Sequence, residues 1–174
     1  MTKNELALRL AQAALLTGDF VLRSGRRSSY YLDKYLFETD PAILESLGEH
    51  LYDLLPNGSV DRLAGPELGA VALAATLSIR SHLPFVIVRK SEKEYGTKKK
   101  FEGVLKAGDR VVIVEDVLTT GGQVLLSAKA LEESGATIVG ILGVVDRQEG
   151  AREAIEKAGY ELRTLFTKSD LGVQ

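Results

Sequence analysis

Two adjacent carboxylates at the end of an apolar segment are the side chains of this chain best placed to do chemistry. Residues 111–114 are apolar, Glu115 and Asp116 follow directly, and two threonines and two glycines occupy positions 119–122. In open α/β sheets the ligand crevice lies at the carboxyl ends of the strands, and a glycine-containing turn into a helix binds phosphate through backbone N–H groups. Carboxylates accept hydrogen bonds from vicinal hydroxyl groups, so this segment is expected to hold a ribose 5-phosphate.

The turn on its own has a simpler interpretation. Threonine and glycine often serve only the bend between a strand and a helix. The carboxylates directly before the turn favour a ligand site instead. Two other phosphate motifs, the P-loop and the Gly-x-Gly-x-x-Gly fingerprint, are missing from the sequence. The histidines, His50 and His82, have no metal-ligand spacing, and we expect both to be ordinary helix residues.

Positive charge is concentrated in two segments. Residues 89–100 carry a net charge of +4 and residues 22–34 a net charge of +3, whereas the whole chain of 174 residues has 22 basic and 24 acidic side chains, which leaves −9 elsewhere. Such runs are often solvated loops. A nucleic-acid partner is not expected, because aromatic residues make up 6% of the chain and the sequence pI is near 5.8. A small phosphorylated ligand fits this distribution better.

The elements that must position these residues follow from the apolar periodicity. From residue 60 on, short β-branched segments alternate with segments of helical period, which predicts a doubly wound, mostly parallel α/β sheet flanked by helices. The expected strands are 60–64, 85–89, 110–115, 137–145 and 161–166, and the expected helices between them are 70–81, 123–134 and 150–158. We expect one domain over residues 1–174, with its α/β core at 60–166.

The first part of the chain has a different pattern. Helices are expected at 4–16 and 40–55, on either side of a polar and aromatic stretch at 20–37. Together, residues 1 to about 38 are expected to form a small N-terminal hood over the sheet. A second irregular stretch, residues 90–109, has no apolar period and is expected to be either a functional loop or an exposed hairpin.

Composition excludes several classes of protein. The chain has no cysteine, which removes thiol nucleophiles, disulfide frameworks and zinc ribbons. The longest apolar runs, 68–77 and 138–145, are much shorter than the roughly 20 residues that cross a bilayer. The expectation is a soluble, cytoplasmic protein that binds neither membrane nor nucleic acid.

The segment 111–123 resembles the signature of type I phosphoribosyltransferases, which bind 5-phospho-α-D-ribosyl 1-diphosphate (PRPP). Three further segments, 24–33, 89–97 and 143–147, make the chain similar to those members of the family that use orotate. The resemblance implies the fold of that family. It also implies transfer of the phosphoribosyl group from PRPP to orotate, giving orotidine 5′-phosphate and diphosphate in pyrimidine (UMP) biosynthesis.

The resemblance also implies roles for individual residues. PRPP would be bound by Arg89, Lys90, Lys93, Glu115, Asp116, Val117, Leu118, Thr119, Thr120, Gly121, Gly122 and Gln123. Orotate would be bound by Arg23, Tyr31, Thr119 and Arg147. The guanidinium of Arg147 can donate two parallel hydrogen bonds to a carboxylate or to a pair of carbonyl groups. Lys93 and Asp116 would be catalytic, with Lys93 acting electrostatically on the diphosphate.

The family further implies a homodimer in which the loop 90–109 is shared across the interface. Mg²⁺ would be carried mainly by PRPP and diphosphate, with no direct protein ligand. Some members have lysine where this chain has Arg23, histidine where it has Tyr95, and a lysine in the diphosphate loop that 65–69 lacks. Two alternatives stay open: another PRPP-dependent nucleobase phosphoribosyltransferase, and a non-catalytic PRPP-sensing regulator on the same fold.

Overall fold

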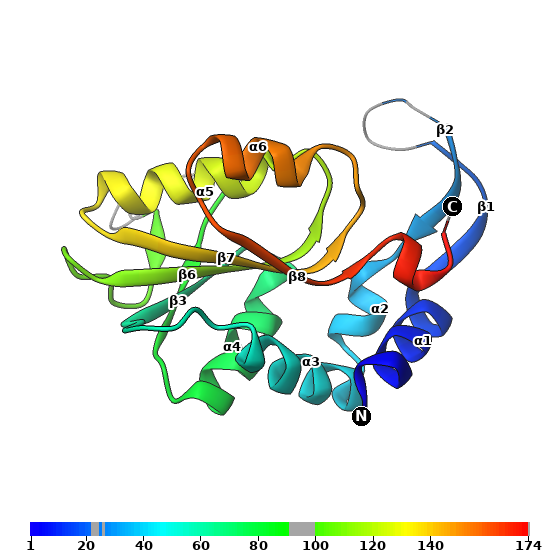
Figure 1. The fold of residues 1–174 in the computed structure, drawn as a ribbon, viewed down its shortest axis with the longest axis horizontal. Coiled ribbons are helices and arrows are strands. Elements are labelled where there is room, and N and C mark those ends of the chain that lie inside the picture. Colours follow the sequence, from blue (N-terminus) through cyan, green and yellow to red (C-terminus); the bar gives the residue numbers. More distant parts are fainter. Residues whose placement is uncertain (22–24, 26, 91–99, 174) are drawn as a thin grey trace.

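A six-stranded sheet runs through the middle of the computed structural model (Figure 1), which describes residues 1–21, 25, 27–90 and 100–173. The strands in chain order are β3 (Arg62–Pro66), β4 (Phe85–Val88), β5 (Phe101–Glu102), β6 (Arg110–Leu118), β7 (Thr137–Asp146) and β8 (Leu162–Thr167). Across the sheet they lie in the order β5-β4-β3-β6-β7-β8, and every neighbouring pair is parallel except β4 with β5. The predicted mostly parallel sheet is therefore confirmed.

Helices cover both faces of this sheet (Figure 1). One face is covered by α3 (Pro41–Asp53) and α4 (Ala70–Ser81), and the other by α5 (Gly122–Glu133) and α6 (Ala151–Lys157). Two separate clusters of buried apolar side chains fill the spaces between the sheet and these helices. Because both faces are covered, most of the strands are mainly apolar, as the sequence indicates.

The hood lies at the end of the sheet where the parallel strands finish (Figure 1). It consists of α1 (Lys3–Ala14), β1 (Leu15–Val21), β2 (Arg27–Leu32) and the short helix α2 (Lys34–Glu38). A capping box between Thr2 and Glu5 starts α1, and Leu6, Leu10 and Ala14 on its inner face are fully buried. The C-terminal 3-10 helix, η1 (Ser169–Leu171), packs against α1.

Several element boundaries differ from the prediction by one to three residues, and two of these differences affect the hood or the site. The first helix ends at Ala14, not at residue 16, because the next residues form β1 and pair antiparallel with β2. Strand β6 continues three residues beyond Glu115, because Val117 and Leu118 still pair with β7. The carboxylates therefore lie within the last residues of β6, where pairing with β7 extends beyond them.

The stretch 90–109 contains one short strand in its described part. Its described end contributes β5, which pairs antiparallel with β4, and the Arg89 N–H donates to the Lys100 carbonyl at 3.0 Å. Residues 91–99 lie outside the described residues. In the part of the chain that the structure covers, no helix combines the length and the apolar composition that crossing a membrane requires.

Candidate active site

The predicted phosphate loop, residues 119–122, connects β6 to the start of α5. Gly121 is the N-cap of α5 in the left-handed conformation, with φ 78°, which favours glycine. A Cβ at Gly121 would also lie 3.2 Å from the carbonyl oxygen of Ala151, so the approach of α6 requires glycine as well. No described side chain caps α5. Its first N–H groups are therefore available to donate to a phosphate.

The two carboxylates before the loop are buried. Glu115 is 8% exposed and Asp116 is 4% exposed. Burial, and then the charge of Asp116, raises the pKa of Glu115 to about 8. Among the described residues, Oε1 of Glu115 has no hydrogen-bond partner. At neutral pH Glu115 therefore keeps its proton, and it can both donate to and accept from a ligand hydroxyl group.

A lysine from the hood contacts the second carboxylate. Lys34, the first residue of α2, places Nζ 2.5 Å from Oδ2 of Asp116. Burial is the largest single influence and lowers the pKa of Lys34, but the charge and hydrogen bond of Asp116 and the charge of Glu38 together raise it above its ordinary value. Glu38, at the other end of α2, is 4% exposed and faces the same carboxylate. Burial, and then the charge of Asp116, raises the pKa of Glu38 to about 8.

Neither Lys34 nor Glu38 belongs to a motif that predicts a role for it in the site. A lysine and a glutamate four residues apart are the usual composition of an exposed helix pair. Only the packing of the hood against β6 buries them beside Asp116. In the sequence, the one indication of a role for Lys34 and Glu38 is that they follow closely after the predicted segment 24–33. That indication does not distinguish them from ordinary surface residues.

Arg147 follows β7 and is held by the hood and by a neighbouring glutamate. Its guanidinium carbon lies 5.0 Å from the centre of the Tyr30 ring, and Nε donates to the Tyr30 hydroxyl at 3.2 Å. Nη2 lies 2.9 Å from Oε1 of Glu149. The backbone N–H of Arg147 donates to the carbonyl of Leu118 at 2.9 Å. These contacts fix a guanidinium, 11% exposed, next to the phosphate loop.

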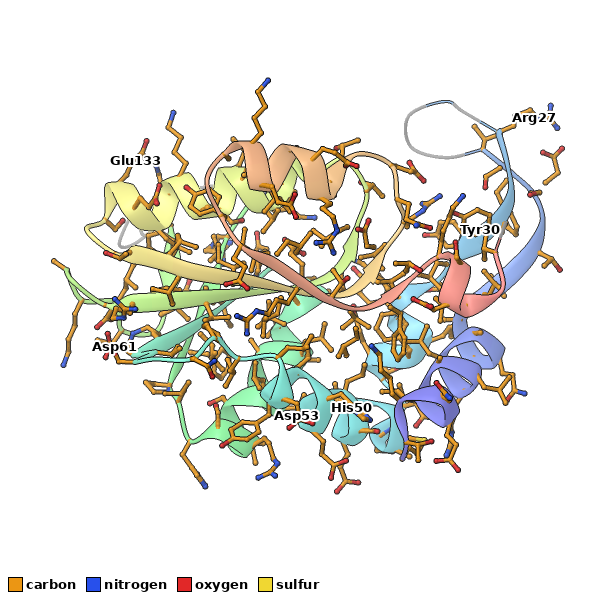
Figure 2. All side chains as sticks on the ribbon, viewed as in Figure 1. Arg27, Tyr30, His50, Asp53, Asp61 and Glu133 are labelled. Carbon is orange, nitrogen blue, oxygen red and sulfur yellow. The ribbon has the colours of Figure 1, made fainter. Side chains whose placement is uncertain are left out.

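The two tyrosines of β2 have different neighbours. Tyr30 lies in the part of β2 that is next to the sheet (Figure 2) and contacts Arg147. Tyr31, which the resemblance places against the base, is 43% exposed and packs on Phe20 with ring centres 5.7 Å apart. Successive residues of a strand point to opposite faces, so only one of the two can face Arg147. The contact of Tyr31 with orotate stays a prediction.

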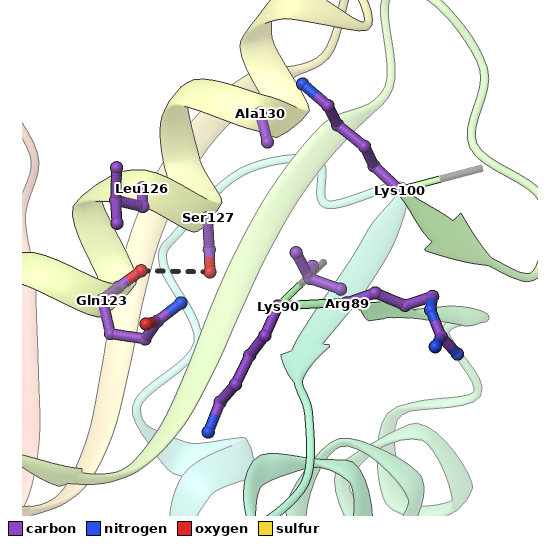
Figure 3. A pocket seen from close by; sticks show the side chains of 8 residues that line it. Arg89, Lys90, Lys100, Gln123, Leu126, Ser127 and Ala130 are labelled. Atoms are coloured by element: carbon purple, nitrogen blue, oxygen red, sulfur yellow. Dashed lines mark hydrogen bonds between the residues drawn. The ribbon is translucent and has the colours of Figure 1, made fainter. Parts of the chain in front are cut away.

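The predicted diphosphate residues Arg89 and Lys90 follow β4. Nη1 of Arg89 lies 3.9 Å from Glu67 and 3.6 Å from Glu102, and the Lys90 N–H donates to Oε1 of Glu67 at 2.7 Å. Glu67, which the sequence analysis did not single out, therefore connects the end of β4 to the turn after β3. Arg89 and Lys90 also border a pocket of about 250 Å³ (Figure 3), whose other lining residues are Val88, Lys100, Gln123, Leu126, Ser127 and Ala130.

Apart from Tyr31 on β2, the predicted site residues that the structure describes come together for one topological reason. Strands β4, β3, β6 and β7 are adjacent and parallel. Their carboxyl ends are followed by residues 89–90, 67–69, 119–122 and 147 respectively, so these groups share one edge of the sheet. Val117 and Leu118 belong to the last residues of β6, and Gln123 to the first turn of α5. Arg23 and Lys93 lie outside the described residues.

Known proteins with this fold and these segments identify the family. The family model described as phosphoribosyl transferase domain matches residues 37–165. The orotate phosphoribosyltransferase of Methanocella arvoryzae is 47% identical over 158 residues, which are 91% of this chain and 90% of that protein.

Solved structures agree with the sequence comparison. A crystal structure of Mycobacterium tuberculosis orotate phosphoribosyltransferase superposes with a TM-score of 0.87, at 32% identity, and covers 98% of this chain and 99% of that chain. A structure of the same enzyme in complex with PRPP gives a TM-score of 0.83, at 30% identity, with 98% and 99% covered. This chain therefore belongs to the phosphoribosyltransferase family and, within it, to the orotate phosphoribosyltransferases.

Proposed function

We propose that this chain transfers the 5-phosphoribosyl group of PRPP to orotate, giving orotidine 5′-phosphate and diphosphate in pyrimidine biosynthesis. The observation that carries the choice of base is the position of Arg147. Its guanidinium is held by Tyr30 and lies next to the turn that would bind the ribose phosphate. A fixed, buried guanidinium at that place suits an anionic pyrimidine, because it can donate two parallel hydrogen bonds to a carboxylate.

PRPP would bind along the carboxyl edge of the sheet. The uncapped start of α5 supplies backbone N–H groups for the 5-phosphate, together with the hydroxyl groups of Thr119 and Thr120. Glu115 and Asp116 would accept from the ribose hydroxyl groups. The diphosphate would then point toward Arg89 and Lys90 at the end of β4, as the pairing of β4 with β3 indicates.

The reaction exchanges two bonds at one carbon. The bond from ribose C1 to the diphosphate oxygen breaks, and its electron pair leaves with the diphosphate. A bond from C1 to the ring nitrogen of orotate forms, and the proton of that nitrogen is released to water or to the diphosphate. Because positive charge develops at the ribose, the site must exclude water and stabilise the leaving diphosphate.

Lys93 is proposed as the principal cation that stabilises the diphosphate, within a loop, 90–109, that closes over the substrate. Mg²⁺ is proposed as a partner of PRPP, since it keeps several waters and needs few protein ligands. When bound, Mg²⁺ would neutralise part of the diphosphate charge. A cytoplasmic location completes the proposal, because the substrates are intracellular metabolites.

We also propose a homodimer in which loop 90–109 serves the partner's site. Mixed dimers of Lys93→Ala and Arg147→Ala chains test this. If Lys93 acts across the interface, one site of each mixed dimer is intact, and about a quarter of the wild-type activity returns after subunit exchange. If Lys93 acts within its own chain, every site carries a defect and no activity returns.

The test of the reaction is the loss of orotate absorbance with PRPP and Mg²⁺. Turnover that needs all three components is the expected result. Turnover with adenine, guanine or uracil but not with orotate would instead assign another nucleobase phosphoribosyltransferase. PRPP binding without turnover on any base, together with a salt-dependent shift of nucleic acid in a gel, would indicate a regulator.

A further inference from the structure

Four charged side chains from two distant parts of the chain form a cluster below the proposed ribose site. Lys34 and Glu38 come from α2 in the hood, and Glu115 and Asp116 come from β6 in the core. The Lys34 Nζ to Asp116 Oδ2 distance of 2.5 Å joins residues 82 positions apart in sequence. All three carboxylates are less than 9% exposed, so water does not screen them well.

The cluster has more negative than positive groups. Three ionised carboxylates beside one ammonium group would leave two uncompensated charges in a buried place, which is costly. Oε1 of Glu38 has no hydrogen-bond partner among the described side chains, although it is buried beside Asp116. Two buried carboxylates this near to each other favour the state in which one of them carries a proton.

The turn after β3 closes the cluster on a third side. A Cβ on Gly69 would lie 1.9 Å from Oδ2 of Asp116, 2.7 Å from Oε1 of Glu38 and 2.8 Å from Nζ of Lys34. The three groups therefore occupy the space that a side chain at position 69 would need. The ammonium group of Lys34 lies against the backbone of the turn that follows β3, at the edge of the sheet where the ligand binds.

We propose that Lys34 and Glu38 are positioning residues that set the orientation and the charge of Asp116 for PRPP binding. Lys34 fixes one oxygen of Asp116 through its ion pair, and Glu38, buried beside the same carboxylate, adds a negative charge to the cluster only when it ionises. This inference rests on the proposed PRPP site. It goes further in making the hood part of that site, because α2 supplies both groups.

Lys34 and Glu38 affect the binding of PRPP in two ways. The N–H of Val117 holds Oδ1 of Asp116, and Lys34 holds Oδ2. With both oxygens held, the carboxylate can accept a hydrogen bond from a ribose hydroxyl in a defined direction. PRPP is also a polyanion, so each uncompensated carboxylate in the cluster weakens its binding. Removing Lys34 therefore reduces affinity through both geometry and charge.

The experiment measures binding of PRPP with Mg²⁺ to the full chain by isothermal titration calorimetry. Lys34→Met keeps the length of the side chain and removes the charge, and about a tenfold weaker affinity is expected at pH 7. Lys34→Arg should recover most of the loss. Lys129→Met is the matched control, because Lys129 is 74% exposed on α5 and pairs only weakly with Glu133 at 4.0 Å. Its affinity should equal that of the wild type.

Glu38 is tested by the pH dependence of the same affinity between pH 6 and 9.5. The charged groups that face Glu38 are Asp116 from β6, and Lys34 and Asp33 from α2 and its cap. Glu115 titrates in the same range and faces Asp116, Lys34 and Lys90. Wild-type affinity should fall as the pH rises through about 8. Glu38→Gln should fall less steeply and bind PRPP more tightly than the wild type at pH 9.

The outcomes separate this inference from the proposed function. A wild-type chain that does not bind PRPP would overturn the proposed function itself. A wild-type chain that binds PRPP, with Lys34→Met and Lys129→Met equal to it, would overturn the role of Lys34. If Lys34→Met fails to fold by circular dichroism, the comparison of Glu38→Gln with the wild type decides, and identical pH profiles would reject the inference.

Discussion

The guanidinium of Arg147 lies on the ring of Tyr30, with its carbon 5.0 Å from the ring centre and Nε donating to the hydroxyl at 3.2 Å. The two residues are 117 positions apart in sequence. The contact joins the hood strand β2 to the end of β7. It makes the hood responsible for the orientation of the group that is proposed to bind orotate.

Removing the hydroxyl of Tyr30 should weaken orotate binding. Tyr30→Phe keeps the ring below the guanidinium and loses one hydrogen bond, which contributes about 1 kcal/mol, so the KM for orotate should rise roughly fivefold. The KM for PRPP should not change. Tyr52→Phe is the control, since Tyr52 is an exposed tyrosine on α3 whose ring contacts Arg80 and not Arg147. Equal KM values for orotate in both variants would contradict the role of Tyr30.

Arg147 should not tolerate replacement by lysine. Lysine has one ammonium group and cannot offer a planar fork, so Arg147→Lys should lose charged hydrogen bonds of about 1.5 to 3 kcal/mol, or roughly 10-fold to 100-fold in kcat/KM for orotate. Steady-state kinetics at saturating PRPP measures this loss. Arg163→Lys, which changes an arginine bound to the carbonyls of Leu54 and Leu55 behind the site, is the control. Normal orotate kinetics in Arg147→Lys would place the base elsewhere.

Lys93 should act mainly on the chemical step. Lys93→Ala should reduce kcat on the order of 100-fold, while the affinity for PRPP changes much less, because the cation stabilises charge that develops as diphosphate leaves. Lys106→Ala removes an exposed cation from the same 90–109 stretch and should leave kcat close to that of the wild type. An unchanged kcat in Lys93→Ala would remove Lys93 from the mechanism.

The stability of the ligand-free chain should fall as the pH rises from about 4.5 to about 8. Burial raises the pKa of Glu38 and of Glu115 from 4.5 to about 8. In that range the folded chain holds protons that the unfolded chain has released, so a rise in pH favours unfolding. The stabilisation is complete below pH 4.5 and lost above about pH 8.

Thermal unfolding at intervals from pH 5 to 9 measures this slope. Glu38→Gln and Glu115→Gln cannot ionise, and each should flatten it. Glu45→Gln replaces an exposed glutamate on α3 and should keep the wild-type slope. Hydrogen bonds from Thr167 lower the pKa of Asp170 below 3.8, so its contribution falls outside the window. Identical slopes in all three variants would contradict the buried protons.

A side chain at position 69 should disturb the site more than the fold. Gly69→Ala places a Cβ against the ends of Asp116, Glu38 and Lys34, which can move aside only by giving up their contacts. Such overpacking costs about 1 to 3 kcal/mol. Because this cost falls on the groups that bind PRPP, we expect the affinity for PRPP to be weaker by roughly tenfold or more. Gly140→Ala is the control, because its nearest atom would be 3.7 Å away. Calorimetry with PRPP compares the two, and equal affinities would show that position 69 has room.

Much of the fold follows from the sequence because its signals are local. Strands covered on both faces are mainly apolar, and helices between them show a 3.6-residue period, so the order of elements after residue 60 is predictable. The extent of β6 was not predictable from the segment itself. Its last residues are a strand only because β7 pairs with them.

The sequence by itself, with the family resemblance for Arg147, predicted that the loop 119–122, the two carboxylates and Arg147 lie together, because each lies at or just after the end of a parallel strand and parallel strands end at one edge. Only the tertiary structure decided that Tyr30, and not Tyr31, contacts Arg147, and that Lys34 and Glu38 are buried beside Asp116. These contacts join residues 82 and 117 positions apart. Their existence depends on the rigid-body position of the hood on the sheet, which no local pattern of side chains specifies.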